Sequence, residues 1–176
     1  MALGTGNTGH VIEFETERLR VGPWHRQADR LGVDLVDVVC DLLTADTTAE
    51  LPEPWRGAYD VERAERWVVE RDGESPTLLA SADDHIIGLL VLFEADRDLR
   101  LGYVIGPERS GNGYATELVG GLVEWARSNA GIATVTGGVS TSNPASARVL
   151  ERNGFQLLDQ GAEMTYRLDV SGVESG

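Results

Sequence analysis

The sequence contains no lysine, a single cysteine and no long uninterrupted apolar run. Without lysine, neither a Schiff base nor the Gly-Lys-Ser/Thr phosphate loop of nucleotide triphosphatases can form. The lone Cys40 cannot make an intramolecular disulfide, and the three histidines show no ligand spacing with it, so no metal site is expected. No stretch reaches the roughly 18 apolar residues of a membrane helix, and the first ten residues lack a secretory signal. These absences predict a cytoplasmic protein with no membrane partner.

Acidic side chains outnumber basic ones by 29 to 15, which gives a formal net charge of -14. A field of this sign repels nucleic acid and anionic lipid and attracts cations. Residues 1–88 hold 8 Arg and 18 acids, a balance of -10, whereas residues 89–176 hold 7 Arg and 11 acids, a balance of -4. The sequence therefore predicts no nucleic-acid partner and places any anionic ligand in the second half of the chain.

Length and composition predict one folded domain. The chain has 176 residues, of which 41% are hydrophobic and 25% charged, close to the averages of soluble proteins. We expect this domain at residues 10–170, between flexible ends at residues 1–9 and 171–176. Strand periods occur at residues 11–24, 77–82, 86–95, 99–105, 132–140 and 155–170, and helical periods at residues 25–43, 60–71, 113–128 and 143–153. This order predicts a mixed α+β fold with a twisted sheet of six to seven strands and about four helices.

The most informative stretch is a glycine-containing loop between a strand and an amphipathic helix: Arg109, Ser110, Gly111, Asn112, Gly113, Tyr114, Ala115 and Thr116. Main-chain N–H groups at the start of a helix converge and can bind phosphate. Gly111 and Gly113 permit positive φ and leave room for an oxygen close to the backbone, while Arg109 adds a positive charge. The alternative is a tight loop whose glycines only satisfy backbone geometry.

Two other phosphate-binding loops do not fit this stretch. A dinucleotide fingerprint needs a third glycine where Thr116 stands, and an acid after the next strand, where the chain has residues 140–142 (Ser-Thr-Ser). A Walker loop needs the lysine that the chain lacks.

Three segments together resemble the GNAT superfamily of N-acetyltransferases, and the resemblance spans most of the chain. Residues 15–20 (Glu-Thr-Glu-Arg-Leu-Arg) resemble its opening strand, residues 101–116 its central strand and pyrophosphate loop, and residues 143–155 its Asn-x-x-Ser to Gly-Phe segment. Residues 113–117 (Gly-Tyr-Ala-Thr-Glu), with residues 146–151 and 154–155, are most similar to the RimJ/RimL type, the ribosomal-protein alanine N-acetyltransferases. The resemblance implies a GNAT-like fold and transfer of acetyl from acetyl-coenzyme A to a primary amine.

The resemblance also implies where the coenzyme binds. Its pyrophosphate lies on the glycine loop and its pantetheine arm beside Asn143, while a main-chain N–H near Val104 or Ile105 stabilises the oxyanion that forms at the thioester. The amine attacks directly, so Cys40 need not be a nucleophile. The expected coenzyme-binding residues are Val104, Ile105, Arg109, Ser110, Gly111, Asn112, Gly113, Tyr114, Ala115, Thr116, Asn143, Ser146 and Arg148.

The sequence departs from the family pattern at two positions. Glu108 stands where the superfamily usually has Gln or Arg, three positions before the first loop glycine. We expect the loop to bind phosphate all the same, because its main-chain N–H groups do not depend on that side chain. Leu150 stands where many relatives carry a tyrosine general acid, so that acid is absent here.

Two residues are candidates for catalysis. Glu94 ends an apolar strand beside residues 99–105, where a separation of strands would admit the acceptor, and it is the predicted general base; the alternative is a solvated turn residue. Tyr103 could hydrogen-bond the acceptor or a water molecule, although it alternates with the apolar Leu101 and Ile105 as a core residue would.

Two classes of function remain open from the sequence, and transfer of an acyl chain longer than acetyl remains open beside them, since it depends on the volume around Ile105 and Tyr103. The first is an N-acetyltransferase whose acceptor is a protein N-terminus or a small-molecule amine, with a preference for cations because the first half is acidic. The second is a non-catalytic acyl-coenzyme A sensor or assembly module. An exposed edge strand could pair two copies as a homodimer.

Overall fold

The computed structural model describes residues 11–172, so the flexible ends predicted at residues 1–9 and 171–176 lie almost wholly outside the described residues. The elements are β1 (Phe14–Glu15), β2 (Arg20–Pro23), α1 (Trp24–Leu31), α2 (Leu35–Leu42), η1 (Glu53–Trp55), α3 (Val61–Glu74), β3 (Thr77–Ala82), β4 (His85–Ala95), β5 (Asp98–Ile105), η2 (Pro107–Arg109), α4 (Tyr114–Arg127), β6 (Thr134–Ser140), α5 (Pro144–Arg152), β7 (Gln156–Gln160) and β8 (Glu163–Asp169).

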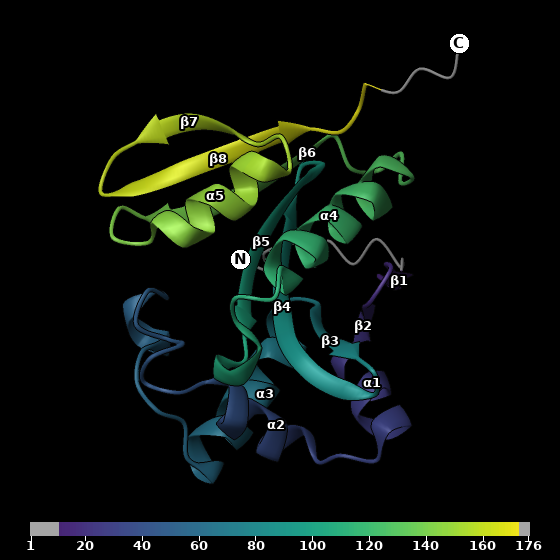
Figure 1. Cartoon of the computed structure of the whole chain (residues 1–176), viewed down its shortest axis with the longest axis vertical. Helices are drawn as coiled ribbons and strands as arrows, with labels where there is room; N and C mark the ends of the chain where they lie inside the picture. Colours follow the sequence, from purple (N-terminus) through teal and green to yellow (C-terminus); the bar gives the residue numbers. More distant parts are fainter. Residues whose placement is uncertain (1–10, 173–176) are drawn as a thin grey trace.

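One mixed sheet runs through the described residues in the strand order β1-β2-β3-β4-β5-β6-β8-β7. Every neighbouring pair is antiparallel except β5 and β6, which are parallel. Helices α1, α2 and α3 pack on one face of the sheet, and α4 and α5 pack on the other (Figure 1). The predicted mixed α+β class is confirmed.

The described chain has eight strands and five α-helices, more than the sequence predicted, for two local reasons. Residues 11–24 form two short strands that pair across a turn, with Phe14 opposite Val21. Gly32 adopts a left-handed conformation with φ 67° and ends α1, so that α2 begins as a separate helix.

Local sequence explains most element boundaries. The Asp60 side chain accepts a hydrogen bond from the Arg63 N–H and caps α3, and the Asn143 side chain accepts one from the Ser146 N–H and caps α5. Asp83 and Asp84 both have positive φ, which closes the hairpin between β3 and β4 with the twist that adjacent strands need.

β4 is buried over residues 87–92, because helices cover both of its faces there. Leu90 and Leu92 point toward α4 and α5, while Leu89 and Val91 point toward α1 to α3. Its nearly continuous apolar sequence follows from this double burial. Among residues 11–172, no helix has both the length and the apolarity to cross a bilayer.

Candidate active site

A gap opens in the middle of the sheet between β5 and β6. These strands pair only from Asp98 opposite Thr134 to Leu101 opposite Gly137. Beyond that point residues 102–105 stay with β4, and residues 138–140 stay with β8. Because β5 leads into α4 and β6 leads into α5, the N-termini of both helices lie at the open end of the gap.

Main-chain N–H groups of β5 point into this gap. Gly106 N–H donates to Ile87 O at 2.8 Å, and alternation along the strand directs the Val104 N–H to β4 as well. The N–H groups of Tyr103 and Ile105 therefore point to the opposite edge, toward the gap. Val104 and Ile105 are the two residues predicted to supply an oxyanion donor. The N–H of Ile105 is available in the gap, whereas the N–H of Val104 is directed to β4.

The glycine loop offers a row of unused donors at the start of α4. Arg109 N–H donates to Gly106 O at 2.9 Å, and Glu117 N–H donates to Gly113 O at 3.1 Å. None of the N–H groups of residues 110–116, which lie between these two, donates to an acceptor in the described part of the chain. Gly111 and Gly113 have φ 80° and 77°, a backbone region that favours glycine. The exposed loop can thus present several N–H groups to one anion.

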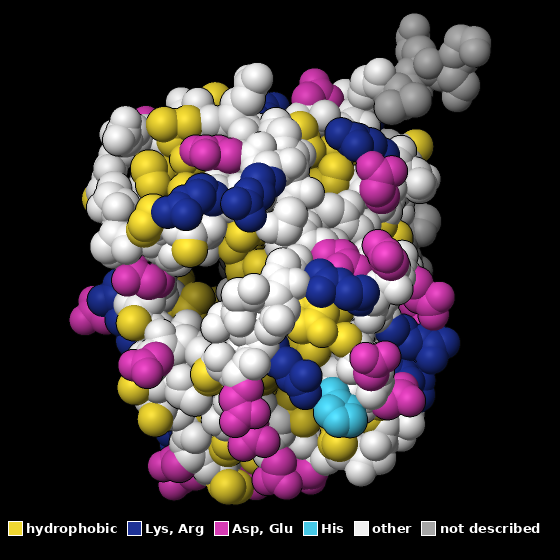
Figure 2. Space-filling view, viewed as in Figure 1, with side chains coloured by type: hydrophobic (Ala, Val, Ile, Leu, Met, Phe, Trp, Pro, Cys, Tyr) yellow, Lys and Arg dark blue, Asp and Glu magenta, His cyan; other side chains and the backbone are white. Residues whose placement is uncertain are grey.

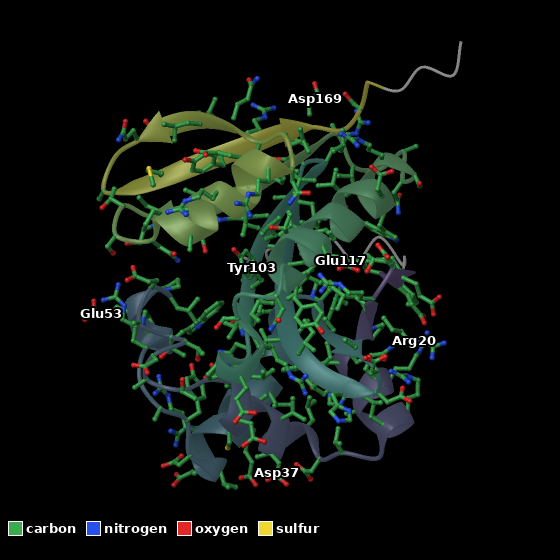
Figure 3. All side chains as sticks on the ribbon, in the orientation of Figure 1. Arg20, Asp37, Glu53, Tyr103, Glu117 and Asp169 are labelled. Carbon is green, nitrogen blue, oxygen red and sulfur yellow. The ribbon has the colours of Figure 1, made fainter. Side chains whose placement is uncertain are left out.

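Tyr103 and the start of α5 form a polar network beside the gap. The Tyr103 hydroxyl donates to Ser146 Oγ at 3.0 Å, and Asn143 Nδ2 donates to the same oxygen at 3.0 Å. Burial raises the pKa of Tyr103, and the hydrogen bond to Ser146 opposes that shift only partly. Tyr103 is therefore a neutral O–H donor near neutral pH. It lies near the centre of the molecule, where the two halves of the fold meet (Figure 3).

The structure brings most predicted coenzyme-binding residues together but separates the two catalytic candidates. Antiparallel pairing sets Glu94 opposite Leu99, at the beginning of β5. Tyr103 lies four residues further along β5, about 13 Å away on an extended strand, at the end where the gap opens. The separation of strands expected beside Glu94 therefore lies at the other end of β5. Arg148 is exposed on α5, and Arg109 is half-buried in η2.

Glu163, which the sequence did not single out, lies at the gap. Gly137 faces Leu150 of α5, so its neighbour Gly138 faces the opposite side of the sheet. The Glu163 carboxylate covers Gly138 so closely that a side chain there would overlap it, and Glu163 Oε1 lies 3.7 Å from Arg100 Nη2. The gap thus has Tyr103 on its α5 side and a carboxylate on its other side.

The long loop at residues 44–59 reaches across to α5. Ser142, just before α5, donates to Glu50 Oε2 at 2.7 Å, and hydrogen bonds from Ser142 and Ser140 lower the pKa of Glu50. The fully buried Thr48 holds the loop in shape, because its hydroxyl donates to Thr44 O at 2.7 Å and accepts from Gly57 N–H at 2.9 Å. A hollow is visible between α5 and this part of the molecule (Figure 2).

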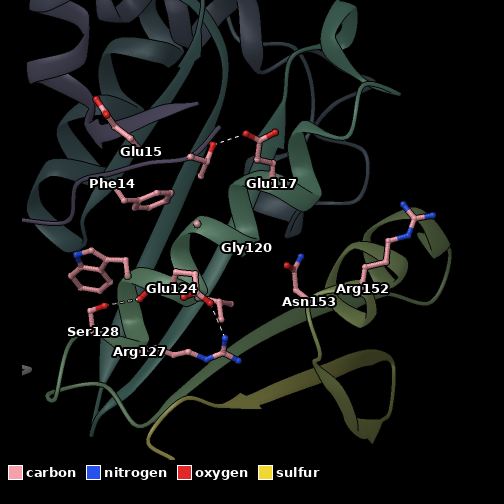
Figure 4. A pocket seen from close by; sticks show the side chains of 13 residues that line it. Phe14, Glu15, Glu117, Gly120, Glu124, Arg127, Ser128, Arg152 and Asn153 are labelled. Carbon is pink, nitrogen blue, oxygen red and sulfur yellow. Dashed lines mark hydrogen bonds and ion pairs between the residues drawn. The ribbon is translucent and has the colours of Figure 1, made fainter. Parts of the chain in front are cut away.

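A separate surface groove of about 750 Å³ runs along α4 between β1 and the end of α5 (Figure 4). Phe14, Trp125 and Asn153 are among its lining residues. None of the residues that the sequence predicted for the site lines it.

The described residues give little support to a cysteine nucleophile or to a metal site. Burial, followed by the charges of Asp37 and Asp41, raises the pKa of the Cys40 thiol, which disfavours the thiolate that a nucleophile needs. In the part of the chain that the structure describes, no three His, Cys, Asp or Glu side chains come together as a metal site would require.

A family model for the acetyltransferase (GNAT) domain matches residues 18–156. The chain belongs to the GNAT acetyltransferase family. Its members are N-acetyltransferase enzymes, and the resemblance found in the sequence to this family is confirmed. A curated relative, the uncharacterized N-acetyltransferase YoaA of Bacillus subtilis, is 34% identical over 98 residues, which are 56% of this chain and 52% of the relative. The chain therefore aligns with about half the length of that relative.

Solved structures of other acetyltransferases share the fold. A GNAT-family acetyltransferase from Bacillus anthracis superimposes with a TM-score of 0.72 at 17% identity, covering 90% of this chain and 99% of that one. Spermidine N-acetyltransferase from Vibrio cholerae, in complex with coenzyme A and spermine, gives 0.71 at 16% identity, with 89% and 98% covered. RimL, the ribosomal L7/L12 alpha-N-protein acetyltransferase, in complex with coenzyme A, gives 0.67 at 15% identity, with 92% and 99% covered.

Proposed function

We propose that this acetyltransferase transfers acetyl from acetyl-coenzyme A directly to a primary amine, on a RimJ/RimL-like site. The observation that carries the proposal is the gap between β5 and β6, with unused N–H groups of residues 110–116 at its open end. Two solved relatives of the same fold, spermidine N-acetyltransferase and RimL, contain coenzyme A. No metal enters the proposed reaction.

The described residues fit coenzyme A. The N–H groups of the glycine loop suit a pyrophosphate, because they are exposed and unpaired at the start of a 14-residue helix. Asn143 and Ser146 would contact the pantetheine arm, which would run between the ends of β5 and β6. Arg109 and Arg148 are the proposed charged contacts to the phosphates.

Each chemical requirement of acetyl transfer has a nearby candidate. The amine nitrogen forms a bond to the thioester carbon, and the carbon–sulfur bond breaks. Ile105 N–H would donate to the carbonyl oxygen as it gains negative charge. The hydroxyls of Tyr103 and Ser146 would supply a proton to the leaving thiolate. They would thus take the place of the tyrosine acid that is absent at Leu150.

The proton that the amine loses needs an acceptor on the far side of the gap. A lysine-like amine with a pKa near 10.4 is almost fully protonated at neutral pH, so a nearby base or water chain helps the reaction. We propose Glu163 for this step, with Glu94 as the alternative from the sequence. Glu163 and Glu50 would also attract a cationic acceptor, whether a protein N-terminus or a small polyamine.

A thiol-release assay tests the function. With acetyl-coenzyme A and a panel of polyamines, lysine analogues and N-terminal peptides, we expect at least one amine to accelerate the release of free coenzyme A thiol. The matched control is acetyl-coenzyme A without amine. If the protein binds coenzyme A but no amine accelerates release, the non-catalytic sensor or assembly module is the correct reading.

Paired substitutions separate the two candidate bases. Glu163→Gln keeps the size of the side chain but removes the base, so kcat/KM for the amine should fall about 100-fold, within the range of general-base contributions. Glu94→Gln should change kcat/KM by less than about threefold, because Glu94 lies in β4 opposite Leu99, away from the end of β5 where the gap opens. Rates measured from pH 6 to 9 would check both. The opposite ranking would return the role to Glu94.

A further inference from the structure

Hydrogen bonds and an ion pair join the turn between β1 and β2 to the first turn of α4. Glu117 Oε1 accepts hydrogen bonds from the Thr16 hydroxyl at 2.6 Å and from the Arg18 N–H at 2.7 Å, and Glu117 Oε2 lies 2.6 Å from Arg18 Nε. The contact between Thr16 and Glu117 is drawn in Figure 4. Burial opposes ionisation of this carboxyl, but the hydrogen bonds from Thr16 and Arg18 hold the pKa of Glu117 below its ordinary value. Glu117 is therefore a carboxylate that fixes residues 16–18 beside the glycine loop.

The Arg18 guanidinium extends from this contact onto the loop itself. Arg18 Nη1 donates to the Asn112 carbonyl at 2.8 Å, and the guanidinium lies 4.5 Å from the centre of the Tyr114 ring. With Nε and Nη1 engaged, the planar group is held in one orientation.

The remaining nitrogen of Arg18 faces the glycine at the start of α4. Arg18 Nη2 lies 3.4 Å from the position that a Cβ atom on Gly113 would occupy. Among residues 11–172 this nitrogen has no hydrogen-bond partner, and 42% of the side chain is exposed. A donor with a full positive charge is thus directed toward the place where the loop N–H groups would hold an anion.

Charge around the loop favours an anion contact through Arg18. Glu108 and Glu117 flank the loop, and the chain as a whole carries a formal charge of -14. Arg18 neutralises Glu117 and still presents N–H groups to solvent. An arginine held in this way can donate to a phosphate oxygen with little further loss of side-chain freedom.

We propose that Arg18 is a ligand for the pyrophosphate of the coenzyme. Nε and Nη1 hold the turn and the loop together, and Nη2 donates to a phosphate oxygen. This inference rests on the proposed coenzyme site. It also gives a physical role to residues 15–20, which lie about 100 positions before the loop: they supply a side chain of the phosphate site.

Calorimetry of coenzyme A binding tests the proposal with a matched pair of variants. Arg18→Gln should raise the Kd about 10- to 100-fold, the value of one charge-assisted hydrogen bond. Arg20→Gln removes an exposed arginine two positions away, which pairs with Glu15 at 3.1 Å, and should change the Kd less than about twofold. Equal Kd values for the two variants would overturn the role of Arg18. Absence of coenzyme A binding by the unaltered protein would instead overturn the proposed function.

Pantetheine, which lacks the pyrophosphate, separates a phosphate contact from a general disturbance of the site. Titration with millimolar pantetheine should give the same Kd for Arg18→Gln and for the unaltered protein. If pantetheine is weakened as much as coenzyme A, Arg18 shapes the site and does not bind phosphate, and the proposal is wrong.

Thermal melting checks that the variants fold. Should Arg18→Gln melt below the assay temperature, Arg18→Lys takes its place. Lysine keeps the charge but cannot hold Glu117, Asn112 and a phosphate at once, so coenzyme A should bind about fivefold more weakly than to Arg20→Lys. Equal binding by the two lysine variants would contradict the proposal.

Discussion

Gly113→Asp is expected to abolish measurable coenzyme A binding, whereas Gly113→Asn should weaken it by no more than about tenfold. Gly113 has φ 77°, and both replacements bear a similar backbone cost because Asn and Asp tolerate the left-handed region better than other residues do. The two variants differ by one negative charge at the place proposed for the pyrophosphate. Like charges about 4 Å apart repel by about 4 kcal/mol at a protein surface, which corresponds to roughly 1,000-fold in Kd.

Arg18 adds to the effect at Gly113. The Cβ of an aspartate at residue 113 would lie 3.4 Å from Arg18 Nη2, so its carboxylate would compete with the phosphate for that nitrogen. Isothermal titration with coenzyme A measures both variants, and thermal melting confirms that they fold. If Gly113→Asp binds coenzyme A as well as Gly113→Asn does, the pyrophosphate does not lie on this loop.

Tyr103→Phe should lower kcat about 100-fold and leave the Kd for coenzyme A within about twofold, as expected for a group that supplies a proton in the transition state. The Tyr103 hydroxyl donates to Ser146 Oγ at 3.0 Å beside the gap. Leu150, which stands where many relatives carry a tyrosine acid, is fully buried against Gly137 and has no proton to donate. Burial raises the pKa of Tyr103 above its ordinary value of 10.0, so the phenol should stay protonated throughout the assay range.

Tyr166→Phe is the matched control for Tyr103→Phe. Tyr166 is also buried behind α5, but its hydroxyl donates to Glu151 at 3.0 Å and takes no part in the Tyr103 network. We expect kcat to remain within about twofold of the unaltered protein, apart from a loss of stability of about 1 kcal/mol for the hydrogen bond. Equal rates for Tyr103→Phe and the unaltered protein would remove Tyr103 from catalysis.

Local features of the sequence predicted the elements well. Asn143 followed by proline marks the start of α5, the pair Asp83 and Asp84 marks a hairpin, and Gly113 marks the start of α4. Each is a short-range effect, because a cap or a turn depends on residues within about four positions. The glycine loop could therefore be found from the sequence alone.

Features that depend on strand register could not be found in this way. Which N–H points into the gap, that of Val104 or of Ile105, is decided by the pairing of β5 with β4. Glu163 reaches the gap only because β8 lies beside β6 with Ser140 opposite it, and Glu94 lies far from the gap because antiparallel pairing reverses the chain. No local pattern reports which strands separate.

Contacts between distant segments were equally hidden. The resemblance to GNAT proteins drew attention to residues 15–20 as a strand, and the sequence offered no reason to join them to the glycine loop. The structure supplies that reason in Glu117, whose carboxylate accepts from both Thr16 and Arg18. A partly buried carboxylate is stable only when donors surround it, so Glu117 holds the distant residues Thr16 and Arg18 beside α4.

Amide NMR of the protein titrated with coenzyme A tests the central claim most directly, since it observes the N–H groups themselves. The N–H groups of residues 110–116 have no protein acceptor in the described chain, so they should show the largest downfield shifts on saturation. The N–H of Val104, which is committed to β4, should move little. Saturable coenzyme A binding that leaves the amides of residues 110–116 unshifted would contradict the account.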